Sequence, residues 1–363
     1  MIAYENLLEL NKPFTESFKQ QFDDFLNSGW YILGKSVSQF EQEFAAWNQS
    51  AHCIGVANGL DALTLALKAY NFEPGSEVIV PSNTYIATIL AILNNNLVPV
   101  LVEPDLRTYN IDPPLMEQAI TPHTRALMVV HLYGKSCAMD AIMAIKHKYN
   151  LILVEDCAQA HGATFNGQQT GTFGEFGAFS FYPTKNLGAL GDAGAVTTNS
   201  AELAGIIRQL RNYGSDRKYY NERIGTNSRL DELQAAFLSV KLKALDDINV
   251  HKRRLASLYL KNLKVDYILP VVEHGYEDVY HIFNIRHPQR DRLKTYLLEH
   301  GIGTEIHYPV PPHRQKAMAG VFNGQTFPIA EEIHKTTLSL PCSYWHSPAQ
   351  IEQVIERLNA FNN

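Results

Sequence analysis

The sequence lacks several features that mark large classes of proteins. No uninterrupted apolar run approaches the ~20 residues that a membrane-spanning helix needs, and residues 1–6 carry neither a basic stretch nor an apolar signal core. The chain also has no block of Lys and Arg, and its formal net charge is −6. These absences argue against a membrane protein, a secreted protein and a nucleic-acid partner. We therefore expect a cytoplasmic protein.

Cysteine is scarce, and glycine does not form the turn that binds dinucleotides. The cysteines lack the short paired spacing of structural zinc sites and redox dithiols, so we expect free thiols and predict no metal site. They are Cys53, Cys137, Cys157 and Cys342. A Gly-x-Gly-x-x-Gly turn is also missing, which disfavours hydride transfer by a bound dinucleotide.

The composition that remains is that of a globular protein. The chain has 363 residues, of which 45% are hydrophobic and 19% are charged, so it can bury a large core. The length exceeds that of one typical domain. We therefore predict a large domain over residues 1–245 and a smaller C-terminal domain over residues 246–363.

The middle of the chain alternates short β-branched runs with stretches of helical periodicity. This alternation is typical of parallel strands joined by crossover helices. The predicted strands are residues 77–80, 98–102, 126–130 and 151–154. The predicted helices between them are residues 85–94, 114–120 and 139–149. These elements predict an α/β fold.

Smaller elements are predicted on the C-terminal side of this region. Glycine-rich pieces at 176–182 and 193–198 are expected to form short antiparallel strands around a turn. A helical stretch from residue 230 to 259 should connect them to a smaller α+β unit. In that unit we predict strands at 265–269 and 280–286 and helices at 290–298 and 348–361.

Residues with useful chemistry follow the predicted strands, at the sheet edge where open α/β sheets bind ligands. Lys185 follows the apolar run 179–182 and precedes a cluster of glycines. A partly buried lysine amine can form a Schiff base with an aldehyde, and glycines would let a flat cofactor approach. From this pattern alone, a solvated surface lysine is an equally good interpretation.

Two further positions would complete a cofactor site. Asp156 follows the strand 151–154, where a carboxylate could serve a metal, a ribose or the ring nitrogen of pyridoxal phosphate; capping of the next turn is the alternative. Gly59 opens an amphipathic helix, whose free N–H groups could bind an anion; an ordinary cap is the alternative. Together the three positions offer an anion seat, a ring partner and an aldehyde-trapping amine.

Two longer motifs, at residues 155–162 and 179–188, resemble the DegT/DnrJ family of pyridoxal-phosphate-dependent nucleotide-sugar aminotransferases. The resemblance runs over nearly the whole chain. It includes the segments 59–63, 81–85, 225–230 and 306–309. It implies a fold-type I architecture, similar to aspartate aminotransferase, with a mixed and mostly parallel sheet, helices on both faces and a smaller C-terminal α+β domain.

The resemblance also assigns roles in binding pyridoxal 5'-phosphate. Lys185 would form the Schiff base and act as the catalytic base, Asp156 would hold the pyridine nitrogen, and Gln159 would lie near the ring hydroxyl. Tyr85 would stack on the ring, although simple packing is the alternative.

The phosphate would be bound by the backbone of Gly59 and Leu60 and by the hydroxyl of Ser180. Many relatives carry a hydroxyl residue after the loop glycine, whereas this chain has Leu60, so backbone donors alone would serve there. Asn227 is implied to reach the phosphate of the neighbouring subunit. This arrangement implies a homodimer with shared active sites.

Contacts to the substrate are expected from residues near the sugar or its diphosphate. They are His307, Tyr308, Tyr182, Arg217 and Tyr219. For His307 an ordinary loop histidine is the alternative. Lys218, Arg223 and Arg229 add positive charge near Arg217 that could receive a diphosphate, but an ordinary charged surface loop explains each of them equally well.

Within the family, the segments 59–63, 85–88 and 212–219 are most similar to enzymes that aminate C3 of a dTDP-3-keto-6-deoxyhexose, with L-glutamate as amino donor. Such enzymes serve deoxyamino-sugar biosynthesis, for example for lipopolysaccharide O-antigen. Amination at C4 of a dTDP- or UDP-linked 4-keto-6-deoxyhexose is the alternative. The C4 configuration, the nucleotide and the receiving glycan stay open. A 3-dehydratase of this fold carries histidine in place of Lys185, and a non-catalytic regulator is the remaining alternative.

Overall fold

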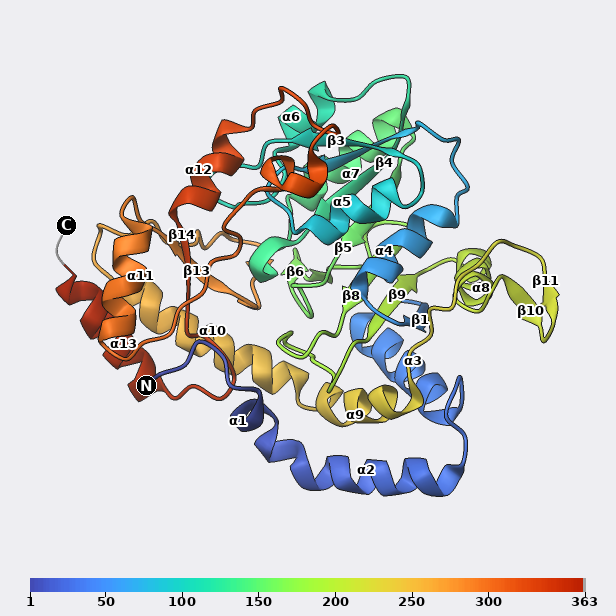
Figure 1. Ribbon diagram of the computed structural model, residues 1–363, viewed down its shortest axis with the longest axis horizontal. Coiled ribbons are helices and arrows are strands. Elements are labelled where there is room, and N and C mark those ends of the chain that lie inside the picture. Colours follow the sequence, from blue (N-terminus) through green and yellow to red (C-terminus); the bar gives the residue numbers. More distant parts are fainter. Residues whose placement is uncertain (362–363) are drawn as a thin grey trace.

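The computed structural model describes residues 1–361, and its centre is a seven-stranded mixed sheet (Figure 1). The strands are β1 His52–Val56, β2 Glu77–Pro81, β3 Val98–Val102, β4 Thr124–Val130, β5 Ile152–Asp156, β8 Phe176–Ser180 and β9 Gly194–Thr198. Their order in the sheet is β1-β9-β8-β5-β4-β2-β3. The pairs from β3 to β8 are parallel, whereas β9 runs antiparallel to both β8 and β1. The predicted mixed, mostly parallel sheet is confirmed.

Helices cover both faces of this sheet. They are α3 Lys35–Asn48, α4 Gly59–Lys68, α5 Ile86–Leu93, α6 Pro113–Gln118, α7 Met139–Tyr149, α8 Ala201–Leu210 and α9 Glu232–Leu242. Successive strand residues point to opposite faces. On β4, Ala126 and Met128 therefore pack with α4, α5 and α8, while Leu127 and Val129 pack with α6 and α7. Helices α3 and α9 cover the remainder of the second face.

The remaining elements lie at the two ends of the chain and in its connections. The longer ones are α1 Leu7–Asn11, α2 Thr15–Ser28, α10 Leu245–Asn262, β13 Phe283–Arg286, α11 Arg290–Glu299, α12 Pro328–Thr336, β14 Thr337–Leu340 and α13 Pro348–Ala360. The short strands are β6 Thr164–Phe165, β7 Gln168–Gln169, β10 Ser215–Arg217, β11 Tyr220–Asn221 and β12 Tyr276–Glu277. Single turns of 3-10 helix are η1 Lys12–Phe14, η2 Leu132–Gly134, η3 Pro312–Arg314 and η4 Lys316–Met318. Figure 1 shows α10 running from α9 towards the antiparallel pair β13–β14 and helices α11 and α13.

The two ends of the chain contribute to cores that lie far from them in sequence. Ile2 packs in the C-terminal core with residues of α10 and α13. Conversely, Met318 and Phe322 pack in the core that joins α4 and α5 to the large sheet. Helix α10 begins at Leu245, beside the predicted domain boundary. The division into residues 1–245 and 246–363 stays a prediction.

Most of the predicted elements are confirmed, and two predictions were wrong. The strand expected at 265–269 is absent from the part of the chain that the structure describes, where only Ile268 forms a single bridge, with Arg286. Val265 is 99% exposed, so its β-branched run has no sheet to join. The helical stretch 230–259 is two helices, because α9 ends at Leu242 and α10 begins at Leu245. No Gly or Pro stands at the break, so the sequence carried no breaking signal there.

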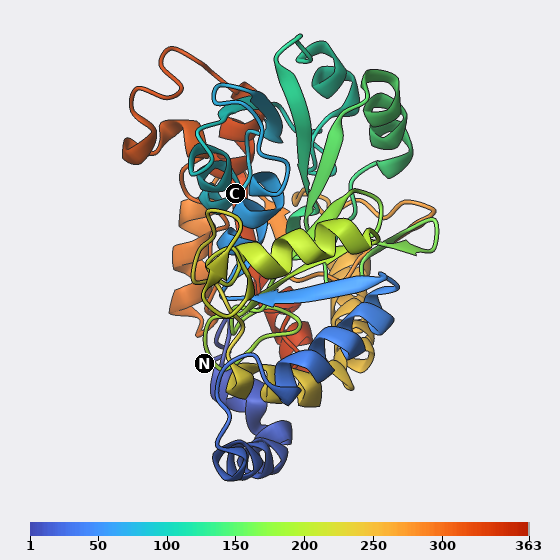
Figure 2. The same ribbon diagram turned by 90° about the vertical axis from the view of Figure 1, so that its right-hand side faces the viewer.

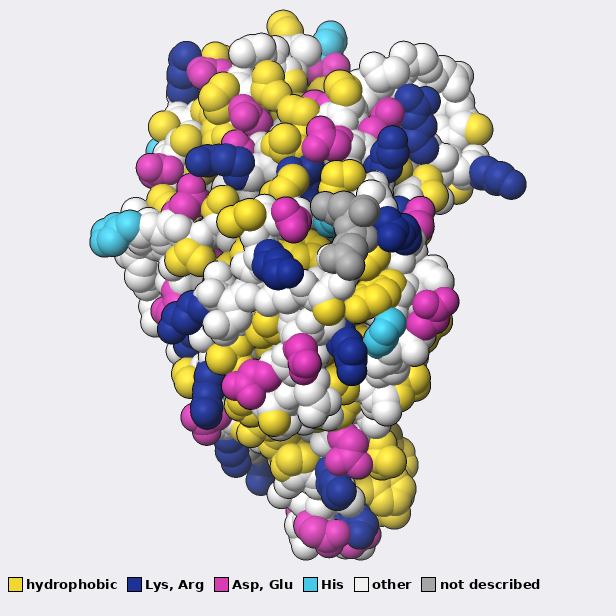
Figure 3. Space-filling view, turned by 90° about the vertical axis from the view of Figure 1, so that its left-hand side faces the viewer, with side chains coloured by type: hydrophobic (Ala, Val, Ile, Leu, Met, Phe, Trp, Pro, Cys, Tyr) yellow, Lys and Arg dark blue, Asp and Glu magenta, His cyan; other side chains and the backbone are white. Residues whose placement is uncertain are grey.

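The charge distribution on the surface and the state of the cysteines agree with what the sequence predicts. Acidic and basic side chains are interspersed on the face drawn in Figure 3, without a large area of one sign. None of the helices within residues 1–361 has the length and apolar composition that crossing a bilayer requires. All four cysteines are buried and unpaired, which confirms the prediction of free thiols.

Candidate active site

A cavity of about 530 Å³ opens at the carboxyl ends of the central strands, within the ~300–1,000 Å³ typical of small-molecule sites. Strands β4, β5 and β8 end at its wall, as expected for ligand sites of open α/β sheets. The cavity brings together ten of the residues predicted from the sequence. They are Gly59, Leu60, Tyr85, Asp156, Gln159, Ser180, Tyr182, Lys185, His307 and Tyr308.

The loop that carries Lys185 is held on several sides. The Asn186 side-chain amide donates hydrogen bonds to Asn249 Oδ1 at 2.8 Å and to the Val279 carbonyl at 3.0 Å. The Leu187 N–H donates to His161 Nδ1 at 3.1 Å. A Cβ at position 188 would lie 2.2 Å from a backbone carbonyl oxygen, so only glycine fits there. Gly188 thus serves the tight loop that follows the lysine.

The Lys185 side chain is half-buried in the cavity wall, and its amine lies close to a histidine for which the sequence carries no functional signal. Burial lowers the pKa of Lys185 to about 8, although the negative charge of Asp156 acts in the opposite direction. Its Nζ lies 3.5 Å from Nε2 of His281. Burial, together with the charge of Lys185, lowers the pKa of His281 well below its ordinary value, so this imidazole is neutral. The only sequence signal for it was a histidine near the start of the predicted strand 280–286.

Asp156 lies at the end of β5 and accepts hydrogen bonds on both carboxylate oxygens. Oδ2 accepts from the Thr88 hydroxyl at 2.8 Å, and Oδ1 accepts from the Ala158 N–H at 3.1 Å. Burial raises the pKa of Asp156, while these two donors and the charge of Lys185 lower it. The carboxylate therefore depends on its neighbours to stay charged in the cavity wall.

The side-chain amide of Gln159 has an orientation fixed by its neighbours. Its Oε1 accepts from the Tyr133 backbone N–H at 2.7 Å, so its amide nitrogen must point the other way. That nitrogen donates to the Tyr308 hydroxyl at 2.8 Å. The rings of Tyr308 and Tyr85 lie 5.1 Å apart, and both line the cavity. The cavity thus presents an N–H donor beside two aromatic rings.

The N-terminus of α4, where the sequence predicts an anion site, borders the cavity. The Asn58 side chain caps the helix by accepting from the Asp61 N–H, while the N–H groups of Gly59 and Leu60 make no hydrogen bond within residues 1–361. A Cβ on Gly59 would lie 2.6 Å from Cβ of Ser180, so glycine is required for the close approach of the two segments. Free backbone donors at a helix N-terminus can bind a phosphate without a side-chain hydroxyl at position 60.

His307 reaches the cavity from the C-terminal part of the chain. Its Nδ1 lies 2.9 Å from the Ser339 hydroxyl. Burial and then the charge of Lys185 lower the pKa of His307 to about 4. At neutral pH this imidazole is therefore an uncharged hydrogen-bonding group.

Three predicted residues lie outside the cavity of their own chain. Arg217 and Tyr219 belong to the hairpin β10–β11, which projects from the body of the molecule in Figure 1 and points towards the viewer in Figure 2. Tyr219 is 85% exposed, and Arg217 lies with its guanidinium 3.8 Å from the ring centre of Tyr220. Asn227 follows the hairpin, in a bridge with Asn212. Among the described residues, none of these three lines the cavity.

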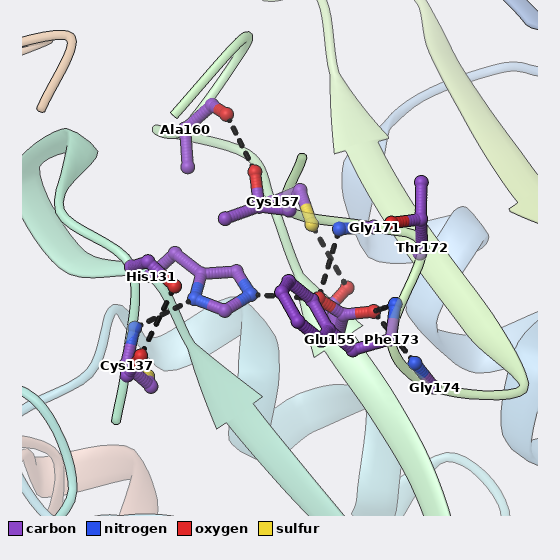
Figure 4. Close-up of polar contacts among 12 residues, drawn as sticks. His131, Cys137, Glu155, Cys157, Ala160, Gly171, Thr172, Phe173 and Gly174 are labelled. Carbon is purple, nitrogen blue, oxygen red and sulfur yellow. Dashed lines mark hydrogen bonds and ion pairs between the residues drawn. The ribbon is translucent and has the colours of Figure 1, made fainter. Parts of the chain in front are cut away.

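A second cluster of polar side chains has the residue types of a metal site, but protein hydrogen bonds already occupy its potential ligand atoms on the histidine and the carboxylate (Figure 4). His131, Glu155 and Cys157 lie close together. Nδ1 of His131 accepts from the Cys137 N–H at 3.0 Å, so Nε2 carries the proton that is shared with Glu155 at 3.0 Å. The Glu155 oxygens also accept from three backbone N–H groups of residues 171–174, each at 2.8 Å. The imidazole and the carboxylate have no lone pair to spare, so this group is a structural network.

The donor set of the cavity fits pyridoxal 5'-phosphate. Lys185 offers an amine for the aldehyde, Asp156 offers a carboxylate for the ring nitrogen, and the start of α4 offers N–H groups for the phosphate. The exposed face of Tyr85 offers an aromatic surface for the ring. Each chemical group of the cofactor therefore has a partner of the right kind in one cavity.

Comparisons with known proteins agree with this geometry. The chain is 53% identical over 362 residues to a dTDP-3-amino-3,6-dideoxy-alpha-D-galactopyranose transaminase of Aneurinibacillus thermoaerophilus, covering 99% of each chain. The structure matches that of DesV of S. venezuelae in complex with a ketimine intermediate, with a TM-score of 0.97, 44% identity and coverage of 99% and 98% of the two chains. It also matches NtdA of Bacillus subtilis with bound cofactor PMP, with a TM-score of 0.91, 31% identity and coverage of 99% and 85%.

The family match extends over almost the whole chain. Residues 13–359 match the DegT/DnrJ/EryC1/StrS aminotransferase family. This match confirms the resemblance seen in the sequence motifs, the aspartate-aminotransferase-like fold and the pyridoxal-phosphate dependence that the motifs imply. The chain belongs to the DegT/DnrJ/EryC1/StrS aminotransferase family.

Proposed function

We propose that this aminotransferase moves an amino group from L-glutamate to C3 of a dTDP-3-keto-6-deoxyhexose in the cytoplasm. The observation that carries the transamination is the Lys185 amine, whose pKa desolvation lowers to about 8, in one cavity with the Asp156 carboxylate. The choice of C3 and of a dTDP sugar is supported by the relative that is 53% identical, which is named as a dTDP-3-amino-dideoxyhexose transaminase.

Lys185 is the proton carrier in this proposal. When bound, pyridoxal 5'-phosphate supplies an aldehyde that takes up the amino group and a ring that withdraws electrons from the reacting carbon. Because burial lowers the pKa of Lys185 to about 8, a sizeable fraction of the amine is uncharged near neutral pH. The amine can then take a proton from the substrate carbon and return it at the other end of the transfer.

The other cavity residues bind and orient. With the cofactor bound, Asp156 would accept a hydrogen bond from the ring nitrogen, and the N–H groups of Gly59 and Leu60 would bind the phosphate. Gln159 donates to the ring hydroxyl, because the Tyr133 N–H fixes its amide nitrogen towards the cavity. Tyr85 covers one face of the ring and excludes water from it.

The exposed hairpin supports a homodimer with shared sites. Arg217, Tyr219 and Asn227 are outside their own cavity, and the hairpin projects away from the body of the chain, as an element that contacts a second copy would. We propose that Asn227 binds the phosphate in the partner's cavity, while Arg217 and Tyr219 contact the substrate there. A two-fold dimer would place both hairpins symmetrically.

Subunit complementation tests this arrangement. Lys185→Ala and Asn227→Ala are each expected to be nearly inactive alone. If the two are unfolded and refolded together, a mixed dimer holds one site with both native residues, so activity should return to about a quarter of the wild-type value. The measurement is the glutamate-dependent transamination rate of the mixture.

The control mixes Lys185→Ala with the double variant Lys185→Ala/Asn227→Ala, in which no site can be complete. Should the first mixture stay as inactive as this control, Asn227 acts within its own subunit and the shared site is wrong.

The position of amination is tested on the product. With L-glutamate and dTDP-3-keto-6-deoxyhexoses of both C4 configurations, we expect NMR to place the new C–N bond at C3. A dTDP- or UDP-4-keto-6-deoxyhexose should react with a kcat/KM lower by at least about 10²-fold, because its carbonyl would lie one carbon away from the Lys185 amine. A C–N bond at C4 as the main product would overturn the C3 assignment and leave the transamination in place.

A further inference from the structure

A pair of buried hydroxyls stands directly behind Asp156. Thr88 is in the first turn of α5 and is 0% exposed, and its hydroxyl lies 2.8 Å from Asp156 Oδ2. The hydroxyl of Thr84, which is 2% exposed, lies 2.7 Å from that of Thr88. Thr88 is part of the segment 85–88 but does not itself line the cavity.

The direction of these hydrogen bonds follows from the chemistry of the groups. An ionised carboxylate can only accept, so the Thr88 hydroxyl donates its single proton to Asp156. The Thr88 oxygen is then available only as an acceptor towards Thr84, and the Thr84 hydroxyl must donate. Two consecutive hydrogen bonds in a buried site strengthen one another. The bond from Thr88 to the Asp156 carboxylate is also charge-assisted.

This chain of donors acts against the burial of the carboxylate. Burial raises the pKa of Asp156, and the Thr88 hydroxyl is the largest of the effects that lower it again, ahead of the Ala158 N–H. The Ala158 bond uses the other oxygen, Oδ1, at 3.1 Å. Thr88 therefore donates to Oδ2 of Asp156, the carboxylate oxygen to which no backbone N–H of residues 1–361 donates.

We propose that Thr88 is a positioning residue that keeps Asp156 ionised and fixed in orientation, and thereby holds the ring nitrogen of the cofactor in its protonated form. This inference rests on the proposed contact between Asp156 and that nitrogen. It predicts that losing the Thr88 hydroxyl weakens cofactor binding only when the cofactor has a ring nitrogen. A purely structural role of Thr88 would not give this dependence.

The test compares two cofactors on the apoprotein. Pyridoxal 5'-phosphate and its 1-deaza analogue, in which CH replaces the ring nitrogen, are titrated into wild type, Thr88→Val and Thr88→Ser. Thr88→Val should weaken binding of pyridoxal 5'-phosphate about tenfold and leave binding of the deaza analogue unchanged. Thr88→Ser keeps the hydroxyl and should bind both like wild type. If Thr88→Val does not fold, Thr88→Ala removes the same hydroxyl and is read in the same way.

Two further variants make the outcomes distinct. We expect wild type to bind pyridoxal 5'-phosphate more tightly than the deaza analogue, and Asp156→Asn to lose this preference. If Asp156→Asn keeps it, the proposed role of Asp156 is wrong. If Asp156→Asn loses the preference but Thr88→Val keeps it, or weakens both cofactors equally, the inference about Thr88 is overturned. Thr84→Val should give a smaller loss of the same selective kind, because its hydroxyl acts through Thr88.

Discussion

Replacing Lys185 with alanine is expected to lower the transamination rate by more than about 10⁴-fold, because one amine both attaches the cofactor and carries the proton. The purified variant should also lack a yellow cofactor band that borohydride can fix to the protein. The measurements are the steady-state rate with L-glutamate, the visible spectrum, and peptide mass spectrometry after borohydride treatment, which should find the cofactor on Lys185 in the wild type only.

Lys185→Arg is the matched control, since it keeps a positive charge but supplies no amine of suitable pKa. It should be as inactive as the alanine variant. Lys241 is the strongest alternative for the lysine that attaches the cofactor, because burial lowers its pKa to about 8 as well. Its Nζ, however, donates to the Gly188 carbonyl at 2.8 Å and to Asn11 Oδ1 at 3.1 Å. A borohydride-fixed cofactor on Lys241 would contradict the assignment of Lys185.

Glu155→Ala is expected to release the loop at residues 171–174 from the sheet. The variant leaves the backbone N–H groups of Gly171, Phe173 and Gly174 and the His131 ring without their buried acceptor. Removing one partner of such a buried charged network costs about 3–5 kcal/mol. If the cost is local, the amide protons of the loop should exchange with solvent about 10²- to 10³-fold faster.

Hydrogen exchange followed by mass spectrometry measures this effect on peptides that cover 171–174. Glu117→Ala is the surface control: it too removes a carboxylate, but the Glu117 carboxylate pairs with Lys148 and both side chains are solvent-exposed. Its effect on exchange should be small. Unchanged exchange of the loop in Glu155→Ala would show that the Glu155 network does not anchor it.

The sequence predicted the parts of the site that depend on short motifs. Asp156 ends a strand, Lys185 follows one, and Gly59 opens a helix, so each lies near its neighbours in sequence and at the same sheet edge in space. The alternation of strands and helices fixed that edge. The family resemblance then gave each residue a chemical role.

Other parts depend on contacts that no local pattern encodes. His281 meets Lys185 across 96 positions, and Thr88 meets Asp156 across 68. Neither stands in a motif with a chemical signature of its own, since a buried Thr or His is common in ordinary cores. The strand expected at 265–269 failed for a related reason: strand formation needs a partner, and Val265 lies in solvent.

The crossing of the two chain ends has an evolutionary consequence. Ile2 completes the C-terminal core, and Met318 and Phe322 complete the core around α4 and α5. Neither half of the gene therefore encodes a self-contained building block. Recombination at the midpoint with an unrelated gene would leave each core without some of its own side chains.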